Sequence, residues 1–147
     1  MALKNELENE LLKAMKSKDV VRRNTLRMTI SSIKLAEVDS GGELDDSTVF
    51  GIMQKEIKIR EETIAEAEKA ERSEMIAPLE AEIRILKEYL PKEMSDEELT
   101  DLVKKIISET GAATIKEMGL VMKNAILEVQ GRAANDRISK IIRELLA

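Results

Sequence analysis

Apolar side chains recur every three or four positions along most of this chain, which is the spacing of one face of an α-helix. The pattern runs from residue 2 to residue 16 and again from Asp19 to about Val38. We therefore predict two amphipathic helices, and Asp19 is the expected N-cap of the second. The second helix carries an apolar stripe of Leu26, Ile30 and Ile33, with Val21, Thr25 and Met28 on its flank.

Two further helices are predicted after a polar loop at residues 39–47, where two glycines interrupt the apolar pattern. Asp46 or Ser47 is the expected N-cap of the third helix. Pro78 fits the first turn of a fourth helix that ends near Tyr89, because the first turn of a helix leaves its N–H groups unbonded. The apolar positions of the third helix include Phe50, Met53, Ile57, Ile64 and Ala67.

The stretch "YLPKEMSDEEL", residues 89–99, predicts a domain boundary. Pro91 stops the helix before it, because proline disfavours a helical conformation in the residue that precedes it. Ser95 and Glu98 then form a capping box, in which each side chain bonds the backbone N–H of the other residue. A new helix should start there and end at Gly111.

Two more helices are predicted after Gly111. Thr114 and Glu117 make a second capping box, and Gly131 is expected to end the helix that they open. Met118 and Met122 lie on the apolar face of this helix, where we expect them in the core. Gly119 lies inside it, and we interpret that glycine as allowing another helix to pack closely, with close approach of a ligand backbone as the alternative.

The fold predicted from these elements is all-α, with an N-terminal helical bundle over residues 1–91 and a small three-helix domain over residues 95–147. The aromatic content supports this fold, because Phe50 and Tyr89 are the only aromatic residues. The core must be built from Leu, Ile, Val, Ala and the eight Met, which suits helix-on-helix packing better than a sheet.

Composition removes several kinds of chemistry. The chain has no cysteine and no histidine, which excludes disulfides, thiolate zinc sites and the commonest general base. Adjacent carboxylates are frequent, but none has the apolar setting that would shift a pKa toward catalysis. We predict no catalytic residue, no metal ligand and no cofactor.

The lengths of the apolar segments bear on the cellular location of the protein. The N-terminal residues lack the uninterrupted apolar segment of a signal peptide, and no run approaches the roughly 20 residues that a membrane span needs. These observations predict a cytoplasmic protein without a membrane partner.

The charge distribution offers one candidate binding surface. The net charge is −5, yet residues 112–147 hold six basic side chains against four acidic ones, or +2. If the last two helices pack side by side, these cations form a shallow surface suited to phosphates. The candidate nucleic-acid contacts are Lys116, Lys123, Arg132, Arg137 and Lys140. The alternative is that they are ordinary solvated cations.

Two other basic clusters have structural interpretations. The first is Arg22, Arg23 and Arg27, in which Arg22 is turned toward the apolar stripe of its helix and, if buried, needs a carboxylate partner elsewhere in the fold. The alternative is that this cluster binds a ligand. Lys55, Lys58 and Arg60 alternate with acidic residues, and pairing within the helix explains them. The charged helix over residues 55–75 is also a candidate surface for a protein partner.

Four stretches resemble the YqeY-like proteins of the GatB/YqeY family across essentially the whole chain: "NTLRM", "QKEIKIREETIAEAEKAER", "LKEYLPKEMSDEEL" and "TGAATIKEMGLVMKNAILEVQGRAANDRISKIIRELL". The residues that match the family pattern are Met118, Gly119, Val121, Met122, Gly131 and Arg132. The C-terminal half also resembles the tail domain of the GatB subunit of glutamine-dependent tRNA amidotransferase. Where the family often has Asp or Asn, this chain has Ala134, so Asn135 or Asp136 is expected to cap the last helix.

The resemblance implies a function but transmits no catalysis, since that tail helps hold tRNA while other domains carry the chemistry. The leading hypothesis is a non-catalytic helical protein associated with tRNA or another RNA. A second is a protein-interaction adaptor that uses the 55–75 helix. A third is an accessory factor in amide transfer, alongside a carbon–nitrogen ligase with glutamine as amido donor.

Overall fold

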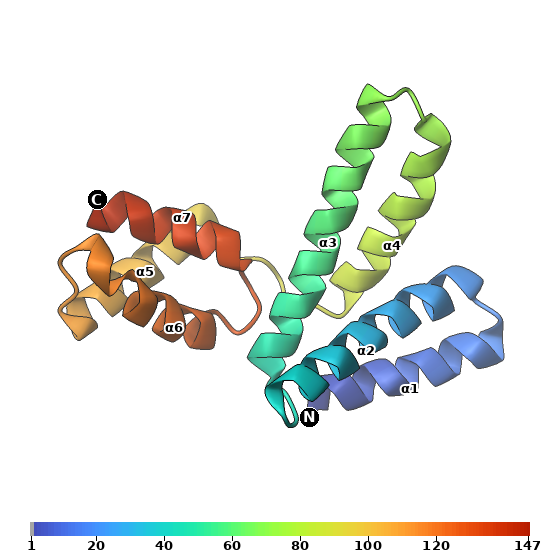
Figure 1. Cartoon of the computed structure of the whole chain (residues 1–147), viewed down its shortest axis with the longest axis horizontal. Coiled ribbons are helices and arrows are strands. Elements are labelled where there is room, and N and C mark those ends of the chain that lie inside the picture. The colour runs from blue at the N-terminus through green and yellow to red at the C-terminus, as the bar shows by residue number, and fades with distance from the viewer. Residues whose placement is uncertain (1) are drawn as a thin grey trace. The chain divides into compact units, whose positions relative to one another are not determined.

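A computed structural model describes residues 2–147, and every regular element in that range is a helix (Figure 1). The all-α fold predicted from the sequence is confirmed. The chain divides into two compact units, the first ending at Leu90 and the second beginning at Pro91. The boundary expected at residues 91–95 lies beside this division. Within the described residues, no helix is long and apolar enough to cross a membrane.

Unit 1 contains two helical hairpins (Figure 1). Helix α1 (Ala2–Ser17) packs against α2 (Val20–Ser40), and α3 (Asp46–Lys69) packs against α4 (Ile76–Glu88), which a short 3₁₀ turn, η1 (Ser73–Met75), precedes. Helix α2 also contacts α3 and α4, so it connects the two hairpins.

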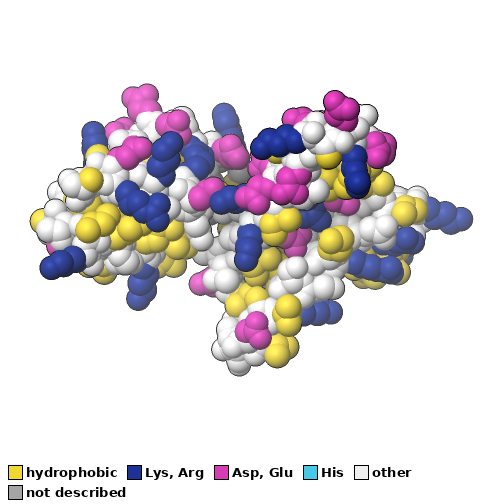
Figure 2. All heavy atoms as spheres, turned by 45° about the horizontal axis from the view of Figure 1, so that its top comes forward, with side chains coloured by type: hydrophobic (Ala, Val, Ile, Leu, Met, Phe, Trp, Pro, Cys, Tyr) yellow, Lys and Arg dark blue, Asp and Glu magenta, His cyan; other side chains and the backbone are white. Residues whose placement is uncertain are grey.

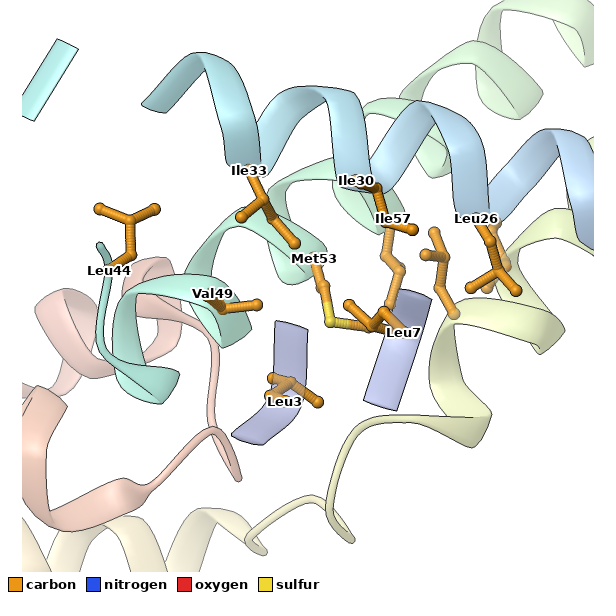
Figure 3. Close-up of a cluster of buried hydrophobic side chains, with 11 residues drawn as sticks. Leu3, Leu7, Leu26, Ile30, Ile33, Leu44, Val49, Met53 and Ile57 are labelled. Atoms are coloured by element: carbon orange, nitrogen blue, oxygen red, sulfur yellow. The ribbon is translucent and has the colours of Figure 1, made fainter. Parts of the chain in front are cut away.

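The core of unit 1 is aliphatic, as the composition requires. Figure 3 shows leucine, isoleucine and valine side chains from α1, α2 and α3 converging on Met53, which is fully buried. The predicted stripe of α2 is confirmed, since its three residues lie in this cluster. The buried members are Leu3, Leu7, Leu26, Ile30, Ile33, Leu44, Val49, Met53, Ile57, Ile83 and Leu86.

One charged network crosses this unit at the side of its core. Arg60 is only 6% exposed, and its Nε donates to Glu82 Oε2 of α4 at 2.8 Å. Its Nη1 donates to the Glu56 carbonyl at 3.0 Å and lies 3.5 Å from the Glu56 carboxylate. That carboxylate is also 3.0 Å from the buried Thr29 hydroxyl of α2. Arg60 therefore pairs within its helix, as predicted, but its shorter bond to a carboxylate joins α3 to α4.

Arg22 has the carboxylate partner that its position predicted. Its Nη1 donates to Glu88 at 2.5 Å and to the Tyr89 hydroxyl at 2.8 Å, both at the end of α4. The guanidinium lowers the pKa of the Glu88 carboxyl by this hydrogen bond. Burial raises the pKa of Tyr89, against the opposing effect of Arg22. The pair fixes the start of α2 against the end of α4.

Unit 2 is a three-helix cluster built from α5 (Asp96–Thr110), α6 (Met118–Val129) and α7 (Asn135–Leu146), with a 3₁₀ turn, η2 (Ile115–Glu117), before α6. All three helices contact one another. Met118 and Met122 pack against the core, in line with their predicted position. The fully enclosed members of that core include Leu99, Val103, Ile106, Val121, Ala125, Ile138 and Ile142.

Several helix starts agree with the sequence and one in unit 1 does not. Asp19 caps α2 by accepting the Arg22 N–H at 3.2 Å, and Ser95 caps α5 by accepting the Glu98 N–H at 3.1 Å. The N-cap of α3 is Asp45 and not the expected Asp46 or Ser47. The Asp45 carboxylate accepts the Thr48 hydroxyl at 2.7 Å and the Thr48 N–H at 2.8 Å. These two bonds lower the pKa of Asp45.

Three local predictions in unit 2 are wrong. Thr114 makes no cap bond, because a 3₁₀ turn intervenes before α6 and Glu117 accepts the Ala113 N–H instead. The N-cap of α7 is Ala134, which has no side chain able to cap, and Asn135 is already helical. Gly119 is exposed, and a Cβ there would meet nothing within 4 Å, so no helix of this chain packs on it.

The buried network predicts a large cost for losing its cation. Arg60→Met should destabilise unit 1 by about 3 kcal/mol, because two carboxylates in a poorly solvated site lose their shared partner. Adding Glu82→Leu should recover part of this loss by removing one of those charges. Urea denaturation followed by circular dichroism measures both. The control is Arg84→Met on the exposed side of α4, and an Arg60→Met cost no larger than the control's would contradict the assignment.

The Asp45 cap predicts a pH-dependent contribution to stability. Asp45→Ala should cost about 1 kcal/mol at pH 7, whereas Asp45→Asn should cost less because asparagine also caps helices. Since the pKa of Asp45 is lowered on folding, its contribution is present above the unfolded pKa and is lost as pH falls through the folded value. The difference between wild type and Asp45→Asn should therefore shrink in acid. Ser47→Ala, at a rejected cap position, is the control.

Candidate nucleic-acid interface

Arg132 lies in the reversal between α6 and α7, where Gln130 and Gly131 both have positive φ. Its guanidinium Nε donates to the Lys92 carbonyl at 2.9 Å, and its Nη2 donates to Glu98 Oε2 at 3.1 Å. Its own carbonyl accepts the Met94 N–H at 2.7 Å. Arg132 therefore ties the α6–α7 reversal to the segment that leads into α5.

Arg137, in the first turn of α7, makes the same kind of connection. Its Nη2 donates to the Met94 carbonyl and to Asp96 Oδ1, each at 2.9 Å. Both arginines were predicted as nucleic-acid contacts, and each has at least one guanidinium nitrogen bonded within unit 2. The Arg132 hydrogen bond also lowers the pKa of the Glu98 carboxyl, together with the backbone bond from Ser95. We infer a structural role for both side chains.

The three predicted lysines have a different setting. Lys116 lies in η2, Lys123 on the outer face of α6 and Lys140 on the outer face of α7, and all three are exposed. None of them has an ion pair or hydrogen bond to another described residue. Lys116 lies in this 3₁₀ turn, and Lys123 lies in the α-helix that follows it. Figure 2 shows the cations of this unit interleaved with apolar and acidic side chains on the visible face.

The charge of unit 2 as a whole is weaker than residues 112–147 suggest. Residues 91–147 contain nine Lys or Arg against ten Asp or Glu, which gives −1. The difference comes from α5 and the segment before it, which are rich in acids at the capping box. Any anionic ligand of this unit must therefore approach α6 and α7 rather than α5.

A stronger basic segment lies in unit 1, of which only the cluster of Arg22, Arg23 and Arg27 was recognised from the sequence. Residues 11–35 carry seven basic side chains against one acidic side chain, Asp19, or +6, which leaves −11 for the rest of the chain. Figure 2 shows Lys or Arg side chains next to apolar ones at the end of the molecule where the α1–α2 turn lies in Figure 1. The cations of this segment are spread over two predicted helices. A sum of charge over a window that slides along the sequence, and is not confined to one helix, would have detected it. The seven are Lys13, Lys16, Lys18, Arg22, Arg23, Arg27 and Lys34.

The described residues offer no metal centre, since no group of three or more of the side chains Asp and Glu is placed to hold an ion. What the geometry provides is cationic surface, in part committed to the fold and in part exposed. Recognition of an anionic partner is the chemistry that such groups perform.

The contacts of Arg132 predict a local change when the side chain is shortened. Arg132→Gln should destabilise unit 2 by about 1 kcal/mol, the scale of a partly exposed pair with a backbone hydrogen bond. Amide exchange at Met94 should accelerate, because its acceptor is the Arg132 carbonyl. Hydrogen exchange read by NMR measures this effect. Arg143→Gln on the exposed side of α7 is the control, and equal exchange in the two variants would contradict the role.

Comparison with known proteins identifies relatives across nearly the whole chain. The family model described as Yqey-like protein matches residues 4–146. A protein of Lachancea thermotolerans named altered inheritance of mitochondria protein 41, mitochondrial, is 33% identical over 131 residues, which cover 87% of this chain and 68% of that protein. Its namesake in Pyrenophora tritici-repentis is 28% identical over 146 residues, or 95% of this chain and 78% of that protein.

The names of these relatives contradict one expectation. They carry the word mitochondrial, so the cytoplasmic location predicted from the sequence is wrong as an inference. It rested on the lack of an apolar leader, but mitochondrial targeting segments are amphipathic and need no such run. Some relatives are longer than the match: the Kluyveromyces lactis namesake is 37% identical over 84 residues, which span 56% of this chain and 45% of that protein.

The family model spans both units, from the first turn of α1 to the end of α7. The resemblance noted from the sequence motifs is thereby confirmed for the whole chain. This protein belongs to the YqeY-like family.

Proposed function

We propose that this protein is a non-catalytic helical protein that associates with RNA, in the first instance tRNA, through the exposed lysines of unit 2. The observation that supports the proposal is the contrast within that unit. Arg132 and Arg137 are engaged by carbonyl and carboxylate oxygens, whereas Lys116, Lys123 and Lys140 extend into solvent. The resemblance of this half of the sequence to a tRNA-holding tail supports tRNA as the anionic partner.

The proposed binding rests on phosphates and not on bases. Lysine ammonium groups on helix surfaces neutralise phosphate charge and release counterions, which gives affinity that falls steeply with salt. Base stacking has no platform here, because Phe50 and Tyr89 are the only aromatics and both belong to unit 1. The role of Arg132 and Arg137 is to hold the frame on which α6 and α7 present their lysines.

A second function, that of a protein-interaction adaptor, is favoured by one observation in unit 1. The sequence analysis placed such a surface on the helix at residues 55–75, but the large exposed apolar side chains there are few, namely Ile59 and Met75. Helix α2 exposes more of them, namely Val20, Val21, Met28, Leu35 and Val38. The two functions use different units and are compatible.

The RNA proposal predicts a charge-dependent loss of binding. The triple variant Lys116→Glu, Lys123→Glu and Lys140→Glu should weaken binding of labelled tRNA at least tenfold at about 50 mM salt. The slope of log affinity against log salt should also become shallower, by roughly 0.7–0.9 for each lost phosphate contact. Filter binding over a salt series measures both quantities.

The matched control is Lys104→Glu with Lys105→Glu, which reverses two exposed cations on α5 of the same unit. This control should bind like wild type if α6 and α7 carry the contact. Absence of wild-type binding at about 50 mM salt, or equal losses in the two variants, would refute the proposal.

A further inference from the structure

The outer face of α2 carries an apolar stripe that no part of unit 1 covers. Val21, Met28 and Leu35 are spaced seven residues apart and are 46%, 55% and 65% exposed. Val38, three positions beyond Leu35, is 77% exposed. The opposite face of α2 lies in the core, where Leu26 and Ile33 are fully buried. Helix α2 is therefore apolar on two sides, and only one of them has a partner in this unit.

The spacing of the outer stripe is that of a coiled-coil seam. Val21, Met28 and Leu35 occupy one seam position of a heptad, and the exposed residues three further on, Asn24, Ser31 and Val38, occupy the other. A repeat of seven keeps a narrow line of side chains in register with one partner helix over its length. From Val21 to Val38 the line runs for about 25 Å at the rise of an α-helix. Two polar seam residues limit its affinity and favour a reversible contact.

The charge beside the stripe selects the kind of partner. Arg27 and Lys34 immediately precede Met28 and Leu35, so they flank the seam on one side. The Arg27 guanidinium lies 3.9 Å from the sulfur of Met15 in α1, which places it at the edge of the α1–α2 hairpin. The last turns of α2 carry two acids: Glu37 is paired with Lys4 at 2.7 Å, and the exposed Asp39 follows Val38 on the other flank of the seam, away from Arg27 and Lys34. These cations belong to the segment of charge +6 at residues 11–35.

We propose that the outer face of α2 is a docking site for an acidic amphipathic helix of a partner protein. The partner helix lays an apolar seam along Val21, Met28, Leu35 and Val38. Acidic residues beside its seam face Arg27 and Lys34, as flanking charges do in coiled coils.

Other occupants match these observations less well. A second copy of α2 would set the basic flank of one helix against that of the other, because antiparallel pairing brings equivalent flanks together. A membrane surface takes a broad apolar face, whereas this stripe is one residue wide and contains Asn24 and Ser31. RNA would use the cations but leave four exposed aliphatic side chains unburied, since bases stack on aromatic rings.

The test uses the full-length protein and a defined probe. The probe is a fluorescein-labelled synthetic helix about four heptads long, with Leu at both seam positions and Glu at both flanking positions. Repulsion between the glutamates of two copies keeps the peptide monomeric when it is dilute. A matched peptide carries Lys in place of Glu. Fluorescence anisotropy should show the acidic peptide binding at least tenfold more tightly, and this preference should decline with salt.

Variants locate the contact. Met28→Glu with Leu35→Glu should weaken binding of the acidic peptide at least tenfold, without changing the melting temperature, because both side chains are exposed. Arg27→Glu with Lys34→Glu should abolish or invert the preference between the two peptides. The matched control, Leu120→Glu with Leu127→Glu, alters two exposed leucines of α6 and should bind the acidic peptide like wild type.

Other results would overturn the proposal. Equal binding of both peptides, or binding unchanged by the Met28 and Leu35 changes, would do so. Binding of anionic phosphatidylglycerol vesicles without binding of the peptide would assign the face to a membrane, and dimerisation in sedimentation lost with those changes would assign it to a second copy. Since the RNA proposal concerns lysines of unit 2, the triple lysine variant should bind the peptide normally, and either proposal can fail alone.

Discussion

A single buried cation organises the interior of unit 1. Arg60 projects from the middle of α3 with almost no contact with water, and carboxylates from its own helix and from α4 compensate its buried charge. One of these carboxylates, that of Glu56 in α3, also lies within hydrogen-bonding distance of the Thr29 hydroxyl of α2. Aliphatic side chains pack in many arrangements of similar energy, whereas this chain of polar contacts is satisfied in one. The network therefore fixes the relative positions of α2, α3 and α4 in a core that is built almost entirely from aliphatic side chains.

The sequence was sufficient for the helices because helical periodicity and capping are local properties. Asp19, Ser95 and the apolar stripe of α2 could be assigned from their neighbours alone. The errors arose where two local solutions compete. Asp45, Asp46 and Ser47 can each cap a helix, and the outcome depends on which one places Thr48 to donate twice. At residues 113–118 a 3₁₀ turn replaced the expected helix start, since Glu117 bonds the Ala113 amide.

The candidate site was harder to predict because charge on a sequence does not reveal its partners. Arg132 and Arg137 looked like ligand contacts on account of their place in a joint between helices. Their carbonyl and carboxylate acceptors lie about 40 residues away in the chain, and only tertiary structure brings these groups together. Helical spacing predicts that the lysines are exposed, but it does not predict the 3₁₀ turn that holds Lys116. The protein therefore has two separate kinds of surface. The exposed lysines of unit 2 form a cationic and polar one, and the outer face of α2 in unit 1 forms a cationic and aliphatic one.

Residues 92–94 are bonded to the α6–α7 reversal. This attachment determines where unit 2 begins when it is considered as a domain that can be joined to other proteins. The helices start at Asp96, and a boundary drawn from helical pattern alone falls at residue 95. Yet the Lys92 carbonyl and both backbone groups of Met94 are bonded by Arg132 and Arg137. Residues 92–94 are thus part of the domain, although they form no regular structure. A gene fusion that joined unit 2 to another protein at residue 95 would remove the carbonyl acceptors of Arg132 and Arg137 and leave only their carboxylate partners, so the portable module begins directly after Pro91.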